Sequence, residues 1–251
     1  MEKPFYRYNH IAIITSLQSF WEIENSEKHL VYIPEDLTTS YEVFESKEPL
    51  VSVHKLFMKA HIPFFYNPPE DVAQAMPEIL LRKTAAHKLL KAAKKLPKGI
   101  IFSISEGYRP LWYQKQIFQE ITLEMKKRHP SFTSEELWEE ATKYVADPTL
   151  CPPHTTGGAV DITICYEHGE MLDMGAKLNA SDENVHTFCE GLAKKQTQNR
   201  QLLFDTLTSV GFVNLPTEWW HYSYGDQYWA IYNHQPNAIY DKLNIQKEGG
   251  F

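Results

Sequence analysis

Residues 151–165 read CPPHTTGGAVDITIC, in which a turn rich in threonine and glycine leads into β-branched residues. Alternate side chains of a strand share a face, so an apolar row faces the core and Asp161 faces the opposite side. The apolar row is Val160, Ile162 and Ile164. A carboxylate in a sheet is costly unless it meets water or a positive partner. The two glycines let the backbone bend, so that His154 folds back beside Asp161 as half of a metal site.

A second candidate half-site lies in PTEWWHYSY, residues 216–224, whose aromatic content is typical of a strand. Glu218 precedes His221 by three positions, and the surrounding aromatic rings would exclude water. In a regular strand these two side chains face opposite ways, so we expect a bulge or an end of strand pairing near Glu218. The alternative is an internal Glu–His hydrogen bond in an aromatic core, without a metal.

Two imidazoles and one carboxylate leave the fourth position of a tetrahedral zinc ion open, as in catalytic rather than structural sites. We therefore predict one zinc ion per chain, with Glu218 as the general base that takes a proton from the attacking water. The predicted ligands are His154, Asp161 and His221. Spacing alone does not prove the site, because His29 and Asp36 have the same seven-residue spacing as the first two ligands.

The turn SEGYRP, residues 105–110, follows the β-branched run IIFSIS, which predicts a strand. Hydrolysis of an amide passes through an oxyanion, and a guanidinium held at the end of a strand is suited to stabilise it. Arg109 is predicted to have this role. The alternative is a surface arginine paired with Glu106.

The composition is that of an ordinary globular protein, since 43% of the 251 residues are hydrophobic and 23% are charged. A chain of this length supports one substantial core. The net charge of −7 offers no general footprint for nucleic acid, and no apolar run approaches the ~18 residues of a membrane helix. Three cysteines and the lack of a convincing signal peptide favour the cytoplasm, although a removed leader would leave no trace and would imply the periplasm.

Helical and strand-like patterns mix without the βαβ order of a parallel sheet, which predicts an α+β fold with helices packed on a mostly antiparallel sheet. Helical spacing or capping predicts helices at 81–93, at 111–128, after Thr133 and within 185–209, and strand-like runs occupy 29–34, 51–57 and 100–105. We expect residues 1–65 to form an N-terminal extension or edge layer of the same domain, and residues 66–251 to form the catalytic domain.

In order along the chain, the motifs EGYRP, HTTGGAVD and EWWH resemble those of the D-alanyl-D-alanine dipeptidases of the VanX type. These zinc peptidases share their fold with D,D-carboxypeptidases, lysostaphin-like endopeptidases and the hedgehog signalling domain. The resemblance extends from about residue 78 to 225 and includes DMG at 173–175. It implies the same three zinc ligands, with Glu218 as catalytic base and Arg109 as the residue that stabilises the transition state.

The chain departs from the family pattern at two positions that the resemblance places near the substrate. A serine of the family is Pro152 here, and the aspartate that ends the family's MGxxFD segment is Asn179. The resemblance implies that these positions meet the carboxylate end and the free ammonium of the dipeptide, and Tyr108 completes the predicted substrate contacts. Because a charge-assisted hydrogen bond is stronger than a neutral one, we expect weaker selection for a free amino terminus.

We expect zinc-dependent hydrolysis of D-alanyl-D-alanine, or of a similar small dipeptide, in bacterial cell-wall metabolism. One alternative is a D,D- or L,D-carboxypeptidase that trims peptidoglycan stem peptides. The other is a non-catalytic, zinc-bearing binding module of the hedgehog type. Glu218 argues against that module, since a pure binding site needs no base.

Overall fold

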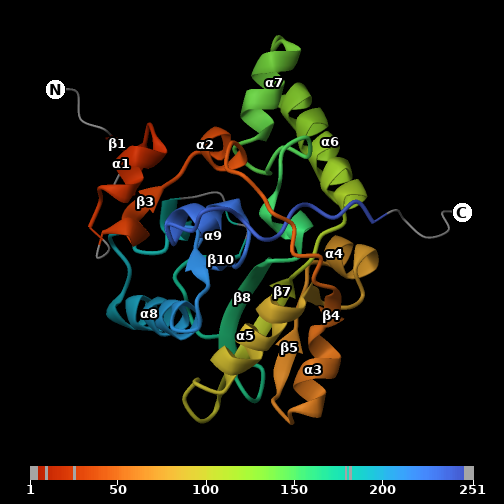
Figure 1. Cartoon of the computed structure of the whole chain (residues 1–251), viewed down its shortest axis with the longest axis vertical. Coiled ribbons are helices and arrows are strands. Elements are labelled where there is room, and N and C mark those ends of the chain that lie inside the picture. The colour runs from red at the N-terminus through yellow and green to blue at the C-terminus, as the bar shows by residue number, and fades with distance from the viewer. Residues whose placement is uncertain (1–4, 9–10, 25–26, 179, 181–182, 246–251) are drawn as a thin grey trace, which may run out of the picture.

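Five strands form the central sheet in the computed structural model, which describes residues 5–8, 11–24, 27–178, 180 and 183–245 (Figure 1). Their order is β5 (Phe64–Tyr66), β7 (Ile100–Glu106), β8 (Ala159–Tyr166), β10 (His221–Ser223) and β9 (Val213–Asn214). Strands β5 and β7 run parallel, and the other neighbouring pairs are antiparallel. The prediction of an α+β fold with a mostly antiparallel sheet is confirmed.

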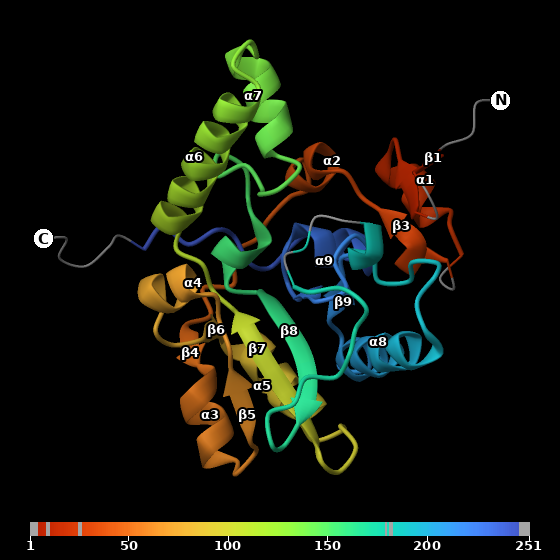
Figure 2. The ribbon, with the colours of Figure 1, turned by 180° about the vertical axis from the view of Figure 1, so that it is seen from behind.

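Helices pack against one face of this sheet and form the main core with it (Figure 2). They are α3 (Val53–Lys59), α5 (Lys83–Ala93) and α8 (Lys194–Thr208). The apolar row of β8 is fully buried there, where it shares one cluster with Phe57, Leu89 and Leu203 of the three helices. The alternation of side chains leaves Asp161 and Thr163 on the opposite side of the strand.

A smaller cluster joins the N-terminal segment to the C-terminal part of the chain. Strands β1 (Phe5–Tyr8), β2 (Ile11–Ile14) and β3 (Val31–Tyr32) form a separate sheet, and α1 (Leu17–Trp21), η1 (Lys28–Leu30) and α2 (Glu35–Thr39) follow its strands. Phe20 of α1 shares this cluster with Val213 of β9 and Ile231 of α9 (Gln227–Tyr232). The predicted boundary at residue 65 stays a prediction; α3 before it and β5, which crosses it, belong to the main body.

A two-stranded ribbon of β4 (Leu50–Ser52) and β6 (Leu80–Arg82) packs against α3 and α5. The prediction of a strand over 51–57 is wrong beyond Ser52, because α3 begins at Val53. The side chain of Ser52 accepts a hydrogen bond from the backbone N–H of Lys55 and caps this helix. The predicted helix at 81–93 begins only at Lys83, since Leu81 pairs with Val51 in the ribbon.

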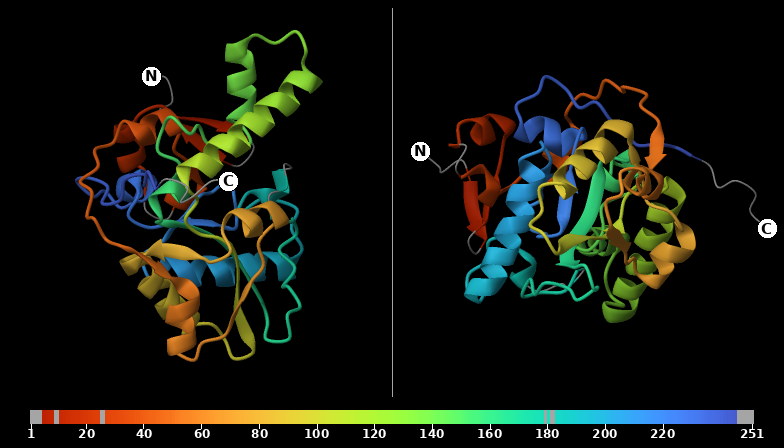
Figure 3. Two further views of the ribbon diagram at one scale, coloured as in Figure 1. Left: turned by 90° about the vertical axis from the view of Figure 1, so that its right-hand side faces the viewer. Right: turned by 90° about the horizontal axis from the view of Figure 1, so that it is seen from below.

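Helices α6 (Leu111–Arg128) and α7 (Ser134–Ala141) form a hairpin that projects from the body of the molecule (Figure 3). Both were predicted, and the capping box of Thr133 and Glu136 is present. The remaining helices are α4 (Glu70–Ala75) and the 3₁₀ helices η2 (Pro153–Thr156) and η3 (Glu183–Val185). Within the residues that the structure describes, none of the helices has the length and apolar character needed to cross a bilayer.

Candidate metal centre

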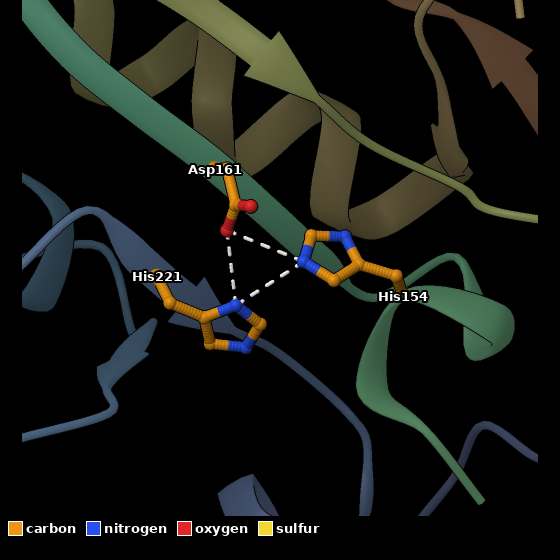
Figure 4. Close-up of side chains that lie close together, drawn as sticks. All are labelled: His154, Asp161 and His221. Carbon is orange, nitrogen blue, oxygen red and sulfur yellow. Dashed lines mark hydrogen bonds and ion pairs between the residues drawn. The ribbon is translucent and has the colours of Figure 1, made fainter. Parts of the chain in front are cut away.

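Three side chains from three elements converge at one point of the sheet (Figure 4). Asp161 lies in β8, His221 pairs with it across the sheet from β10, and His154 comes from η2. His221 Nδ1 lies 3.0 Å from Asp161 Oδ1, and His154 Nε2 lies 3.2 Å from both of these atoms. The structure therefore brings together the three residues that the sequence predicted as ligands.

The turn before β8 aims His154 at the cluster. Gly157 ends η2 with φ of 74°, a conformation that favours glycine, and the backbone N–H of Arg109 donates to the carbonyl of His154. His154 Nδ1 lies 2.9 Å from the carbonyl oxygen of Gly107, which can only accept a hydrogen bond. The Nδ1 atom therefore carries a hydrogen, and Nε2 is the ring nitrogen that faces Asp161 and His221.

Burial and charge act in opposite directions on this cluster. The three residues are at most 6% exposed. Burial alone would raise the pKa of Asp161, but the charges and hydrogen bonds of His154 and His221 lower it overall. Burial alone would lower the pKa of His154, but Asp161 raises it. Two imidazole nitrogens and one carboxylate oxygen in contact, with a single formal negative charge, are a donor set that fits Zn²⁺.

Glu218 precedes the strand that carries His221. The backbone N–H of His221 donates to the carbonyl of Glu218, and this turn places Glu218 Oε2 4.0 Å from His221 Nδ1. The predicted end of strand pairing near Glu218 is confirmed, since β10 begins at His221. Burial raises the pKa of Glu218, while its side chain remains 39% exposed and reachable from solvent. A carboxylate with these properties is suited to accept a proton.

Arg109 forms a two-pronged ion pair with Glu106, with both contacts at 2.6 Å, and its Nη1 donates to Gln114. The register of β7 and β8 pairs Glu106 with Asp161 at a bulge, so the ion pair lies beside the cluster. Burial alone would lower the pKa of Arg109, but Glu106 raises it. The alternative predicted from the sequence was a surface arginine paired with Glu106. The pair is present, but the side chain of Arg109 is only 15% exposed. Its role at an oxyanion stays a prediction.

A cavity of about 410 Å³ opens on the same side of the sheet. Thr163, two positions after Asp161, lines it, together with Ser105 of β7 and Trp219, which follows Glu218. The loop from Met171 to Leu178 also lines it. The cavity is large enough for a small peptide, and Thr163 and Trp219 are close in sequence to Asp161 and Glu218 of the candidate site.

Two of the three predicted substrate contacts, Tyr108 and Pro152, lie in the part of the chain that the structure describes. Tyr108 is only 5% exposed, and its hydroxyl lies 3.5 Å from the carbonyl oxygen of Leu243. Pro152 is buried, and its carbonyl oxygen accepts hydrogen bonds from the N–H and hydroxyl of Thr155. Asn179 lies outside the described residues. The substrate roles of these three residues remain predictions.

Ser223 and Gln114 are two neighbours of the site that the sequence pattern did not identify. Ser223 Oγ lies 3.4 Å from His221 Nε2, the ring nitrogen that faces away from Asp161. A partner of this kind fixes the ring orientation of a metal ligand. Ser223 follows His221 by two positions in a strand, and side chains two positions apart share a face. This spacing is the sequence feature that could have identified Ser223 as a neighbour of His221. Gln114 follows Arg109 by five positions, across a proline and a helix start, and no periodicity links the two.

Two imidazoles and one carboxylate beside a glutamate that solvent can reach are the arrangement of mononuclear metallohydrolases. The sequence profile of the family described as D-ala-D-ala dipeptidase matches residues 69–241. The chain belongs to this family. The matched region contains His154, Asp161, His221, Glu218 and Arg109.

Two proteins named D-alanyl-D-alanine dipeptidase, from Escherichia coli K12 and a Synechocystis strain, are 38% and 34% identical to this chain over 88 and 108 residues. The matches cover 34% and 39% of this chain and 46% and 44% of those proteins, so the chain spans less than half of each. A third, from Enterococcus faecium, is 28% identical over 163 residues, which are 62% of this chain and 75% of that protein. The solved LD-carboxypeptidase LdcB aligns with 92% of this chain and 89% of its own, with a TM-score of 0.41 and 20% identity.

Proposed function

We propose that the protein is a zinc-dependent dipeptidase that hydrolyses D-alanyl-D-alanine or a closely similar small peptide in bacterial cell-wall metabolism. One observation carries the proposal: Asp161, His154 and His221 meet within 3.2 Å of one another, next to the carboxylate of Glu218. The names of the related proteins and the family match support the choice of substrate.

His154, Asp161 and His221 would hold one zinc ion. Zinc bound there supplies Lewis-acid polarisation of the scissile carbonyl and activates the attacking water. Glu218 accepts the proton of that water, because partial desolvation raises its pKa and makes its carboxylate more basic than that of a fully solvated glutamate. It then delivers the proton to the leaving nitrogen. Arg109, whose orientation Glu106 fixes, adds a positive charge beside the reacting carbonyl.

The substrate is proposed to lie in the cavity beside Thr163 and Trp219, with its scissile bond at the metal centre. The wall from Met171 to Leu178 is formed largely by apolar side chains, which suits a peptide of small apolar residues. The resemblance places an aspartate carboxylate near the free ammonium of the substrate, and the neutral amide of Asn179 lacks that negative charge. We therefore expect N-blocked or longer peptides to be tolerated better than in a relative with aspartate there.

The test combines metal analysis with release of D-alanine from three substrates: D-alanyl-D-alanine, its N-acetylated form and a pentapeptide stem. The expected result is about one zinc per chain and cleavage of the free dipeptide, with measurable cleavage of the acetylated one. Cleavage of the stem peptide alone would establish the carboxypeptidase alternative. Stoichiometric zinc with no cleavage of any of the three would establish the binding module.

The ligand assignment has a matched control in the second His–Asp pair of the same spacing. His154→Ala is expected to lose zinc, because it removes one of three protein ligands. His29→Ala is expected to keep it, since His29 packs against Phe188 with the ring centroids 4.9 Å apart. Equal zinc content in both variants would refute the assignment.

A further inference from the structure

Arg82, at the end of β6, is a buried arginine whose whole guanidinium is engaged. It is 1% exposed. Its Nη1 and Nη2 atoms each donate to one carboxylate oxygen of Glu45 at 2.9 Å. Nη1 also donates to the carbonyl of Glu48 at 2.7 Å, and Nη2 to the carbonyl of Asp241 at 3.2 Å. Nε donates to the carbonyl of Thr156 at 2.8 Å, and Thr156 belongs to the turn that carries His154.

The backbone of Arg82 holds the same turn. Its N–H donates to the carbonyl of Gly157 at 2.8 Å. A Cβ atom on Gly157 would lie 2.6 Å from the side chain of Leu50 and 3.4 Å from Cγ of Arg82, so the ribbon and the turn are in direct contact. Arg82 therefore holds the carbonyls of both Thr156 and Gly157, which follow His154 in the turn.

The ribbon also holds the second contact of His154. The backbone N–H of Tyr108 donates to the carbonyl of Leu80 at 2.8 Å. A Cβ atom on Gly107 would lie 2.7 Å from that same carbonyl oxygen. Because the carbonyl of Gly107 accepts from His154 Nδ1, strand β6 fixes both the turn that carries this ligand and the acceptor that orients its ring.

The partners of Arg82 come from both ends of the chain. Glu45 and Glu48 precede the region 69–241 that matches the family. Glu45 also accepts from the backbone N–H of Asp241 at 2.7 Å, and the ring of Tyr240 lies 5.1 Å from the guanidinium carbon. The N-terminal segment and the C-terminal segment thus close around this one side chain.

We propose that Arg82, together with Glu45, is a positioning residue for the metal centre: it holds the turn 153–157 so that His154 Nε2 faces Asp161 and His221. The proposal rests on the proposed function, since it assigns these three residues to a zinc ion. A lysine could not replace the arginine, because the three N–H donors of an ammonium lie on one nitrogen and cannot reach Glu45, the turn and the C-terminal segment together. Loosening the turn removes the pre-set geometry on which metal affinity depends.

The test compares Arg82→Lys and Glu45→Gln with Arg200→Lys. Arg200 is a matched control, since it is also 1% exposed and donates to backbone carbonyls, those of Met174 and Asn184, outside the ligand turn. Each holo protein is prepared with zinc, and the zinc dissociation constant is measured by competition with a chromogenic chelator. Thermal unfolding of the zinc-loaded proteins is measured alongside.

Arg82→Lys is expected to weaken zinc binding by about 10- to 100-fold, the range for partners that orient a metal ligand. The zinc dissociation constant of Glu45→Gln is expected to lie between those of Arg82→Lys and wild type. Arg200→Lys is expected to lower the melting temperature while the zinc dissociation constant stays within about twofold of wild type. At saturating zinc, Arg82→Lys should recover the wild-type KM but not the full kcat.

Wild-type zinc affinity in both Arg82→Lys and Glu45→Gln would overturn the positioning role, and so would an equal loss in Arg200→Lys. These outcomes are separate from a failure of the proposed function. A wild type that binds zinc and cleaves none of the three peptides would refute the dipeptidase while leaving the affinity comparison intact. A wild type that binds no zinc would overturn both.

Discussion

At the residue scale, Asp161 and its two histidines bind either protons or a metal. Three atoms with lone pairs lie within 3.2 Å of one another in a buried space, and in the metal-free protein they would repel without a shared proton. The raised pKa of His154 and the lowered pKa of Asp161 describe this proton-bound state. Zinc competes with protons for the same lone pairs, so its affinity should rise with pH.

For the metal-free protein we predict an unfolding free energy that is highest between about pH 4 and 6.5. The folded pKa of His154 is raised above 6.5, so its contribution is complete below that value and is lost as the pH rises through the folded pKa. The folded pKa of Asp161 is lowered from 3.8, so its contribution is present above that value and is lost at lower pH. Urea unfolding at a series of pH values measures the curve.

Asp161→Asn is the control for this pH dependence, because a neutral amide cannot form an ion pair with a protonated His154. The variant should lose much of the decline above about pH 6.5. If the metal-free wild type and Asp161→Asn gave parallel curves, the buried pair would not be the source of the pH dependence.

A second residue-scale prediction concerns Glu218. Glu218→Gln keeps the shape of the side chain but cannot accept a proton, so hydrolysis should fall by at least ~10²-fold while zinc content is unchanged. Single-turnover cleavage of D-alanyl-D-alanine with matched zinc loading measures this. Glu170→Gln is the control, since Glu170 also lies beside a histidine, His168, but at the surface with 72% of its side chain exposed. Activity of Glu218→Gln close to that of the control would place the base elsewhere.

At the element scale, the site depends on how strands β8 and β10 meet. The register places His221 opposite Asp161, and just beyond the paired residues the N–H of Tyr224 donates to the carbonyl of Gly158. A Cβ atom on Gly158 would lie 2.2 Å from the carbonyl oxygen of Tyr224, a contact that backbone atoms must move to relieve. The glycine pair before β8 therefore serves close strand approach as well as the bend at His154.

We predict that Gly158→Ala lowers the unfolding free energy by about 1–3 kcal/mol and also weakens zinc binding, because the shift displaces β10 and with it His221. Gly191→Ala is the control. Gly191 has φ of 84° with no atom near its missing Cβ, so its substitution has only a backbone strain of about 1–2 kcal/mol and leaves the site in place. Chemical denaturation and zinc titration of both variants separate the two effects. Unchanged zinc affinity in Gly158→Ala would contradict the argument.

At the scale of the whole molecule, two apolar clusters share strand β9 and the residue before it. Phe212 belongs to the main core, and Val213 packs with the N-terminal layer around Phe20. The N-terminal layer is therefore joined to this sheet at β9, whereas Asp161 and His221 lie on β8 and β10.

Phe20→Ala is predicted to lower the unfolding free energy by about 3–5 kcal/mol, because it removes a fully buried ring. Zinc affinity should remain that of wild type, since none of the ligands belongs to this cluster. Phe44→Ala, which changes a residue 65% exposed, should alter stability by less than about 0.5 kcal/mol. Urea denaturation and zinc titration provide the measurements, and a loss of zinc affinity in Phe20→Ala would show that the layer supports the site directly.

Features with local physical causes were predictable from the amino-acid sequence. The helix at 111–128 and the capping box at Thr133 follow from side chains three or four positions apart, which share a helix face. The buried row of β8 follows from the two-residue period of a strand, and this period also assigned Asp161 to the site. The three candidate ligands were predicted because two short motifs contain the residue types that zinc requires, and the structure brings these residues together.

Contacts between residues far apart in the chain could not be predicted from the sequence. His221 and Asp161 are 60 positions apart, Arg82 and Thr156 are 74 apart, and Arg82 and Glu45 are 37 apart. The same limit explains the missed start of α3, where the apolar run at 51–57 has no period that separates a short strand from a short helix. The free energy of such contacts depends on which segments the fold packs together and on how much water they exclude, and no spacing within one motif contains that information.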